Sequence, residues 1–195
     1  MRQGGNMEKV CAIVLAAGDG KRMRSSRPKV LCEVLFRPMI CWIAGVLEEC
    51  GVRDVCAVLG TGADQVHAAV PRFSWVEQKE RLGTGHAVMQ AKAFLQEHRG
   101  GDCAVLYGDT PLMDADTLQK AYLLHKKEGA AVTLVTASLP DPAGYGRIVR
   151  NEKGDVSGIV EQAFVGGDVI RGERRVGSGE NRDDRFAVGG EEYER

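Results

Sequence analysis

The chain of 195 residues is long enough to bury the core of one domain. Hydrophobic residues make up 44% of it and charged residues 27%, proportions that are typical of a folded soluble protein. The formal net charge of −1 disfavours a dedicated nucleic-acid-binding protein, because such proteins usually carry a clear positive excess.

The first seven residues, MRQGGNM, are predicted to form a disordered extension over 1–7. They carry one charge and lack the apolar stretch of a secretory signal peptide. Apolar runs elsewhere in the sequence stay well short of the roughly 18 residues that cross a bilayer. We therefore expect a cytoplasmic protein without a membrane partner.

The six cysteines form no C-x-x-C pair, and most of them lie inside apolar segments such as VCAIVLA and DVCAVLG. A buried free thiol behaves as a small hydrophobic side chain. The pattern predicts a reduced protein without a disulfide framework. A metal cluster is disfavoured because the ligand spacing and nearby histidines that it requires are missing.

Short strand patterns alternate with helical patterns along the chain. The predicted strands cover 9–16, 54–59, 74–78, 102–107 and 130–137, and the predicted helices cover 39–50, 62–69, 85–98 and 115–128. Four of these strands, all but 74–78, are nearly continuous apolar runs, which is typical of parallel strands covered on both faces. The alternation predicts a doubly wound α/β domain, in which ligands bind beyond the carboxyl ends of the strands.

Two segments follow the predicted sheet. Extended pieces over 146–150 and 156–160 flank the turn cluster NEKGD and predict a β-hairpin laid onto the sheet domain. Residues 163–195 are rich in glycine and charge, and they show no sustained apolar period. Two interpretations stay open for this tail: a disordered charged segment, or a segment never selected as part of the fold because the reading frame was lost.

An unusual loop follows the first predicted strand, in the stretch LAAGDGKRMRSSRPKVL. Gly18 and Gly20 allow a sharp turn and a close approach to a ligand. Backbone N–H groups after a strand can form an anion-binding nest, and Arg22 and Lys29 add positive charge. The pattern matches neither the P-loop nor the dinucleotide fingerprint. A glycine-rich turn with solvated basic residues is the alternative.

Two further strand ends carry unusual sequences. EQKERLGTGHA places Gln78 where its amide could contact a nucleobase, and Thr84 where it could simply cap the helix that follows. In LYGDTPL, Asp109 follows a strand directly, a position that suits Mg²⁺ binding together with substrate phosphates. The alternative for Asp109 is an ordinary Asp-Thr-Pro turn. Three such sequences at neighbouring strand ends favour one common site.

Five motifs occur in the order LAAGDGKRM, RPKVL, LGTGHA, LYGDTPL and GYGRIVR…GIVEQ. Together they resemble the uridylyltransferase domain of the bacterial GlmU family, the UDP-N-acetylglucosamine pyrophosphorylases, over residues 8–162. The first two motifs alone indicate only a sugar-phosphate nucleotidyltransferase or a related enzyme. The later motifs are much more specific.

The resemblance implies an α/β fold with a Rossmann-like, doubly wound mixed sheet, as in the GT-A-like nucleotide-diphospho-sugar transferases. It also implies that this fold is incomplete at the C-terminus. It also implies Mg²⁺-dependent transfer of UMP from UTP to N-acetylglucosamine 1-phosphate, which yields UDP-N-acetylglucosamine and pyrophosphate for cell-wall and lipopolysaccharide synthesis. Attack of the sugar phosphate on the α-phosphorus requires positioning and charge neutralisation rather than a protein nucleophile.

The resemblance further implies roles for single residues. Arg22 and Lys29 would be the catalytic cations at the UTP phosphates, and Asp109 would bind Mg²⁺. The substrate contacts would come, in chain order, from Leu15, Ala16, Ala17, Gly18 and Lys29 around the nucleotide, Gln78, Gly83 and Thr84 around uracil, Tyr107, Gly108 and Asp109 at a strand end, and Gly146 and Glu161 beside the amino sugar.

The sequence departs from the family after residue 162. The family carries one asparagine there for the sugar and another for Mg²⁺, and Asn181 stands in a context, ENRDD, that matches neither. We expect the acetyltransferase β-helix domain, with its trimerisation surface, to be absent, which predicts a monomer or weak oligomer. These departures predict poor folding or weak UTP binding.

Two alternatives to the implied reaction stay open. The same chemistry could act on another sugar 1-phosphate, or use CTP in place of UTP. The chain could instead be an inactive, truncated relic that binds nucleotide at most. A nucleic-acid partner is disfavoured because the basic cluster is confined to one loop rather than spread along a face.

Overall fold

The computed structural model describes residues 7, 9–18, 27–141, 143, 145–152 and 156–160. The chain divides into two compact units, Met1–Gln119 and Lys120–Arg195, which are treated separately below. The predicted domain over 8–162 is thus shared between two units, and the predicted tail over 163–195 lies outside the described residues.

The first unit is built on a parallel sheet. Its strands are β1 (Val10–Ala16), β4 (Val55–Leu59), β5 (Ser74–Glu77) and β6 (Asp102–Tyr107). They lie in the order β5-β4-β1-β6, with every neighbouring pair parallel. β1 and β4 are buried almost throughout, as their continuous apolar sequences predict. The predicted α/β class is therefore confirmed.

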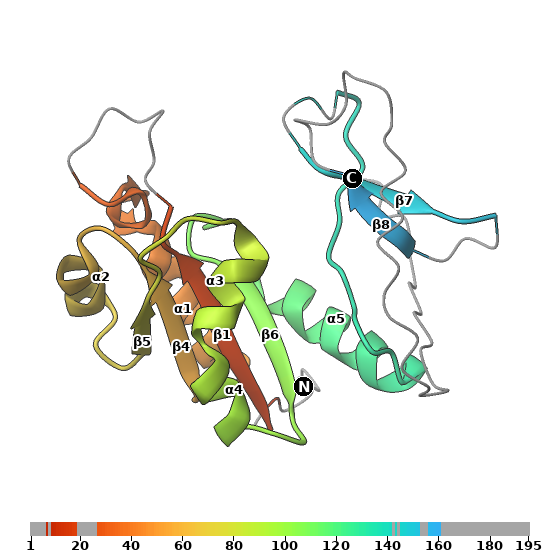
Figure 1. Ribbon diagram of the computed structural model, residues 1–195, viewed down its shortest axis with the longest axis horizontal. Coiled ribbons are helices and arrows are strands. Elements are labelled where there is room, and N and C mark those ends of the chain that lie inside the picture. Colours follow the sequence, from red (N-terminus) through yellow and green to blue (C-terminus); the bar gives the residue numbers. More distant parts are fainter. Residues whose placement is uncertain are drawn as a thin grey trace. The chain divides into compact units, whose positions relative to one another are not determined.

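Helices cover both faces of this sheet (Figure 1). They are α1 (Met39–Glu49) on one face, α3 (Thr84–Gln90) and α4 (Lys92–Glu97) on the other, and α2 (Ala63–Ala69) between β4 and β5 in sequence. Because successive strand side chains point to opposite faces, β1 and β4 supply apolar surface to both layers. One core cluster joins the two strands to α3 and α4 through Ile13, Ala17, Cys56, Val58, Ala87 and Ala91.

Two short elements link β1 to α1. A 3₁₀ turn, η2 (Lys29–Leu31), is followed by a small antiparallel hairpin of β2 (Glu33–Val34) and β3 (Arg37–Pro38). Val30 and Leu31 are buried and anchor the turn, which leaves the Lys29 side chain at the surface.

The second unit holds most of helix α5 (Ala115–Glu128) and a hairpin of β7 (Arg147–Arg150) and β8 (Val156–Val160). Asp114 caps α5, because its carboxylate accepts a 2.7 Å hydrogen bond from the Thr117 N–H. β7 and β8 pair antiparallel, so the predicted hairpin is confirmed.

Three predicted elements differ from the structure. Residues 130–137 form no strand within the described chain, because an apolar run becomes a strand only where a partner backbone pairs with it. The predicted helix over 85–98 is two helices, since the backbone changes at Ala91, whose N–H bonds to Val88 in a tighter turn. Within the described part of the first unit β6 pairs with β1 alone, and Cys103, Val105 and Tyr107 along it are exposed.

Met7 is also placed differently from the prediction. The disordered extension over 1–7 was expected to include it, yet Met7 is 1% exposed, and its carbonyl accepts a hydrogen bond from the Val10 N–H. A large apolar side chain at the end of a buried strand gains free energy by packing. Residues 1–6 lie outside the described part.

The cysteines fit the expectation of free thiols. Cys11, Cys50 and Cys56 are buried, and all six are unbridged. Burial raises the pKa of each of these three thiols, so they stay protonated at neutral pH. In the described part of the chain no helix has both the length and the apolarity needed to cross a membrane.

The tip of the β2–β3 hairpin has an unusual backbone. Leu35 and Phe36 adopt positive φ angles of 50° and 61°, and their side chains are 76% and 97% exposed. Residues other than glycine have a strained backbone in this left-handed region. The hairpin is nevertheless held, because the Trp42 indole donates a 3.0 Å hydrogen bond to the Val34 carbonyl and Arg37 stacks over the Trp42 ring.

We predict that Phe36→Gly raises the free energy of unfolding by about 1 kcal/mol, because it removes a left-handed strain and no buried contact. Urea denaturation followed by circular dichroism measures the change. Leu112→Gly is the matched control: Leu112 is 87% exposed but has no positive φ, so the same kind of change there should not stabilise. Equal effects at both positions would contradict the role of backbone strain.

Candidate functional site

The carboxyl ends of the strands bring distant segments together. Leu15 in β1 pairs with Val58 of β4 on one side and Tyr107 of β6 on the other. The chain runs from β1 to β4 and β5 on one side of β1 and then crosses to β6 on the other side, so the strand order reverses at β1, and a ligand crevice is expected at such a switch point. A cavity of about 290 Å³ lies at this end.

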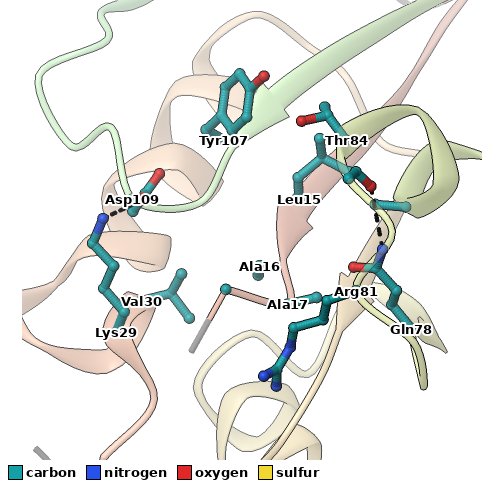
Figure 2. A pocket seen from close by; sticks show the side chains of 13 residues that line it. Leu15, Ala16, Ala17, Lys29, Val30, Gln78, Arg81, Thr84, Tyr107 and Asp109 are labelled. Atoms are coloured by element: carbon teal, nitrogen blue, oxygen red, sulfur yellow. Dashed lines mark hydrogen bonds and ion pairs between the residues drawn. The ribbon is translucent and has the colours of Figure 1, made fainter. Parts of the chain in front are cut away.

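Ten of the predicted site residues line this one cavity (Figure 2). They are Leu15, Ala16, Ala17, Gly18, Lys29, Gln78, Gly83, Thr84, Tyr107 and Asp109. Gly108 lies directly behind the lining, and its N–H donates a 2.9 Å hydrogen bond to the Leu15 carbonyl. Gly146 belongs to the second unit. Arg22 and Glu161 lie outside the described residues.

Close backbone approach shapes the floor of the cavity. A Cβ atom on Gly60 would lie 2.9 Å from the Ala17 carbonyl oxygen, and one on Gly108 would lie 3.2 Å from the Val30 side chain. Both glycines thus allow the loops after β4 and β6 to press against the end of β1. The Ala17 and Gly18 backbone is left beside the open space of the cavity.

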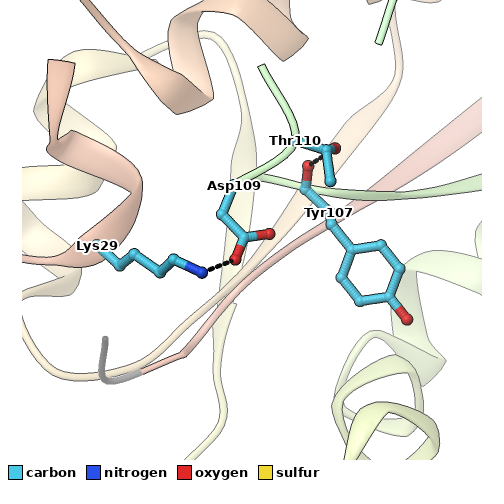
Figure 3. Close-up of polar contacts among 4 residues, drawn as sticks. All are labelled: Lys29, Tyr107, Asp109 and Thr110. Atoms are coloured by element: carbon cyan, nitrogen blue, oxygen red, sulfur yellow. Dashed lines mark hydrogen bonds and ion pairs between the residues drawn. The ribbon is translucent and has the colours of Figure 1, made fainter. Parts of the chain in front are cut away.

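Lys29 and Asp109 form the charged wall of the cavity. The Lys29 ammonium lies 2.5 Å from Asp109 Oδ2, although 80 residues separate them in the sequence (Figure 3). The Thr110 hydroxyl donates a 2.8 Å hydrogen bond to the Tyr107 carbonyl and so braces the turn that carries Asp109. The two side chains remain 36% and 29% exposed, and such an exposed pair adds little to stability.

Gln78 and Gly83 form an uncharged wall opposite this pair (Figure 2). Gln78 is only 6% exposed, and its backbone N–H donates a 2.7 Å hydrogen bond to the Leu59 carbonyl. Its amide nitrogen lies 3.3 Å from the Gly83 carbonyl and 3.2 Å from His86 Nδ1. The position of the amide is therefore fixed from two sides.

Thr84 is not the helix cap that the sequence allowed as an alternative. The N-cap of α3 is Gly83, with φ 100° and ψ 179°, and Thr84 is the first helical residue without a side-chain capping bond. This backbone conformation is nearly restricted to glycine, so the chain enters the helix at Gly83. The Thr84 side chain is left exposed at the cavity.

The lining also includes Val30, Arg81 and Ala87, which the sequence analysis did not single out. Arg81 lies in the loop after β5, and its guanidinium donates a 3.0 Å hydrogen bond to the Thr61 hydroxyl. The sequence did contain a signal for Arg81: it is a basic residue only three positions after Gln78, which itself follows the end of a predicted strand. Val30 and Ala87 are buried and supply apolar lining.

The residues present fit a hard divalent cation held together with substrate. Asp109 places one carboxylate at the cavity, and Mg²⁺ is commonly held by one or two carboxylates plus substrate phosphates. The described residues contain no group of three or more His, Cys, Asp or Glu side chains that would form a complete metal cage. Asp109 is thus the residue that would hold the cation.

The chain is similar to known nucleotidyltransferase sequences. The family model of the MobA-like NTP transferase domain matches residues 12–155. The bifunctional protein GlmU of Thermoanaerobacter pseudethanolicus is 44% identical over 156 residues, and that of Brevibacillus brevis is 47% identical over the same length. Each match covers 80% of this chain but 34% of the relative, so the chain spans about a third of the length of these relatives.

A solved structure shares the fold. UDP-glucose pyrophosphorylase complexed with UDP-glucose superposes with a TM-score of 0.61 at 22% identity, covering 78% of this chain and 68% of that one. At this level of identity the likeness concerns the fold of the nucleotidyltransferase domain.

We predict that Gly83→Ala lowers the free energy of unfolding by about 1–3 kcal/mol, because alanine is strained at φ 100°. Thermal and urea denaturation measure the loss. Gly85→Ala, two residues later inside α3, is the control: a Cβ there meets nothing within 4 Å, and alanine favours a helix by up to about 1 kcal/mol. A Gly83→Ala variant as stable as Gly85→Ala would contradict the assigned backbone constraint.

Proposed function

The chain belongs to the family of MobA-like NTP transferase domains, and from this premise we propose that it transfers a nucleotidyl group from UTP to a sugar 1-phosphate. The observation that carries the proposal is a single cavity with charged groups on one wall and a buried amide on the other. A nucleoside triphosphate presents the same division, with anionic phosphates at one end and a hydrogen-bonding base at the other.

The charged wall suits phosphate binding. Lys29 lies at the cavity in contact with Asp109, and Arg81, which Figure 2 shows nearer to Gln78, adds another cation to the lining. In-line displacement at a phosphorus atom requires alignment and neutralisation of charge, which such cations supply. We infer that Lys29 contacts the triphosphate and that Arg22, outside the described residues, adds a second catalytic cation.

Asp109 is the proposed Mg²⁺ ligand. Asp109 would hold the ion, and a bound cation would supply positive charge that offsets the negative charge of the substrate phosphates. The protein's own contribution is to hold the carboxylate at the end of β6, where the turn is braced by Thr110. Because Lys29 already contacts Asp109 Oδ2, we infer that the ammonium moves toward the nucleotide phosphates when both substrate and cation are present.

The uncharged wall is proposed to hold the base. Gln78, Gly83 and Thr84 would contact uracil, while the backbone from Leu15 to Gly18 would support the nucleotide between the two walls. Tyr107 and Gly108 would shape the end of β6. Gly146, the residue before β7, and Glu161 are proposed to contact the amino sugar.

The acceptor is proposed to be N-acetylglucosamine 1-phosphate. The support is the similarity to proteins named GlmU over 156 residues, together with the motifs LGTGHA and YGDTPL in the cavity wall. The product would then be UDP-N-acetylglucosamine, a precursor for cell-wall synthesis. Another sugar 1-phosphate, or CTP as donor, remains the second candidate within the same chemistry.

Pyrophosphate release measured over a panel of nucleotides and sugar 1-phosphates tests the proposal. We expect the highest kcat/KM for UTP with N-acetylglucosamine 1-phosphate, and only in the presence of Mg²⁺. Equal turnover of CTP would favour the second candidate. Absence of pyrophosphate release with every pair, from a protein whose circular dichroism shows that it is folded, would overturn the proposal.

We predict that Asp109→Asn lowers Mg²⁺-dependent pyrophosphate release at least 100-fold, because a neutral amide binds the cation weakly and no longer pairs with Lys29. The control is Asp102→Asn, which makes the same change at the opposite end of β6, away from the cavity. Its activity should stay within about twofold of the parent protein. Unchanged Mg²⁺ dependence in Asp109→Asn would rule out the proposed metal role.

A further inference from the structure

Two cysteines that are far apart in the sequence lie side by side in the sheet of the first unit. Cys11 in β1 is the direct partner of Cys103 in β6, and these two strands are parallel neighbours (Figure 1). We propose that the two thiols form a binding site for one Cu(I) ion, a soft monovalent cation held between two thiolates. The site is separate from the proposed nucleotide site, because it lies near the amino ends of the strands rather than at their carboxyl ends.

The pairing of the strands places both sulfur atoms on the same face of the sheet. Residues directly opposite each other on neighbouring parallel strands point the same way, and such strands lie about 4.7–4.9 Å apart. The ladder between β1 and β6 runs through Cys11 and Cys103 without a register shift. The two thiols are also hydrogen-bonding partners of each other. Regular backbone structure therefore holds two sulfur ligands in place before any cation binds.

The spacing of the strands suits a metal bridge better than a disulfide bond. A disulfide usually requires Cβ atoms about 3.5–4.5 Å apart, which is less than the separation of neighbouring strands. Both thiols are free in the structure. Two metal–sulfur bonds in line, each about 2.3 Å long as in a zinc thiolate, span about 4.6 Å. A cation therefore fits between the two sulfur atoms without moving the strands.

The number of ligands selects the kind of cation. The described residues contain no group of three or more His, Cys, Asp or Glu side chains that could hold a metal ion. The next thiol across the sheet, Cys56 in β4, is the partner of Ile13 rather than of Cys11. Structural zinc sites use four protein ligands, whereas soft thiolates favour Cu(I), which is stable with two sulfur ligands. The pair thus fits Cu(I) and not Zn²⁺.

One side of the pair is open to solvent and the other is closed. Cys103 is exposed, because within the described part of the first unit β6 pairs with β1 alone. Cys11 is only 3% exposed. It also belongs to the lining of a second cavity, of about 270 Å³, at this end of the sheet. A cation can therefore arrive at the exposed thiol, while the buried thiol holds it where little water competes.

Binding exchanges two protons for one cation. Burial raises the pKa of Cys11, and partial burial together with the neighbouring Cys11 thiol raises the pKa of Cys103 to about 12, so both thiols are protonated without metal. Each sulfur releases its proton to solvent and forms one bond to copper, with no change of oxidation state. The resulting complex carries one negative charge. Lys9 and Arg99 in the lining of the second cavity add positive charge nearby, and Asp54 adds one negative charge.

Competition between the reduced full chain and a chromophoric Cu(I) chelator, without oxygen, measures the affinity. We expect one Cu(I) per chain, with two sulfur neighbours in its X-ray absorption spectrum. Cys103→Ala should weaken binding more than about 100-fold, because even the loss of a residue behind a metal ligand commonly costs 10–100-fold. Cys56→Ala is the matched control: it removes a thiol from the same sheet whose strand partners, Ile13 and Ser74, are not cysteines. Its affinity should stay within about threefold of the parent protein.

Folding is checked separately from binding. Cys103 is exposed, so Cys103→Ala should keep the circular dichroism spectrum of the parent protein. A cation that binds only the folded state raises the melting temperature, so Cu(I) should raise it in the parent and not in Cys103→Ala. Cu(I) affinity that is unchanged in Cys103→Ala would overturn the proposal. An equal loss in Cys56→Ala would also overturn it, because a different set of thiols would then hold the ion.

Discussion

The pairing of β1 with β4 on one side and β6 on the other is the constraint on which the cavity depends. Parallel pairing aligns the carboxyl ends of these strands, so Leu15, Val58 and Tyr107 lie side by side. Gly60 and Gly108 then allow the neighbouring loops to approach the end of β1 more closely than any larger residue would permit. The strand order reverses at β1, with β4 and β5 on one side and β6 on the other, and this reversal is where a crevice is expected.

The two walls of the cavity are built by different physical means. The charged wall depends on attraction between Lys29 and Asp109, and both remain partly exposed, so solvent and ligands can compete for them. The uncharged wall depends on the buried Gln78 amide, whose nitrogen lies within hydrogen-bond distance of the Gly83 carbonyl and of His86 Nδ1. The first wall can rearrange around a phosphate and a cation, whereas the second presents a fixed hydrogen-bonding edge.

The covering of the sheet is uneven. β1 and β4 lie between helical layers, but β6 exposes alternate side chains, including Val105 and Tyr107. Tyr107 nevertheless belongs to the cavity lining, so the exposed edge and the proposed site share a strand. The β2–β3 hairpin likewise has an exposed part and a held part. Leu35 and Phe36 at its tip have left-handed backbones and face solvent, whereas contacts of Trp42 with Val34 and Arg37 hold its base.

The sequence by itself determined the alternation of strands and helices, the free thiols and the positions of the three unusual strand ends. These features depend on local patterns of apolar residues and glycines, which act through neighbouring residues. Ten predicted residues consequently line one cavity, while their chemical roles stay predictions. Only the tertiary structure decided that Lys29 pairs with Asp109 across 80 residues and that Arg81 lines the same space. It also decided that 130–137 forms no strand in the described chain, because a strand requires a partner backbone that only the folded chain brings near.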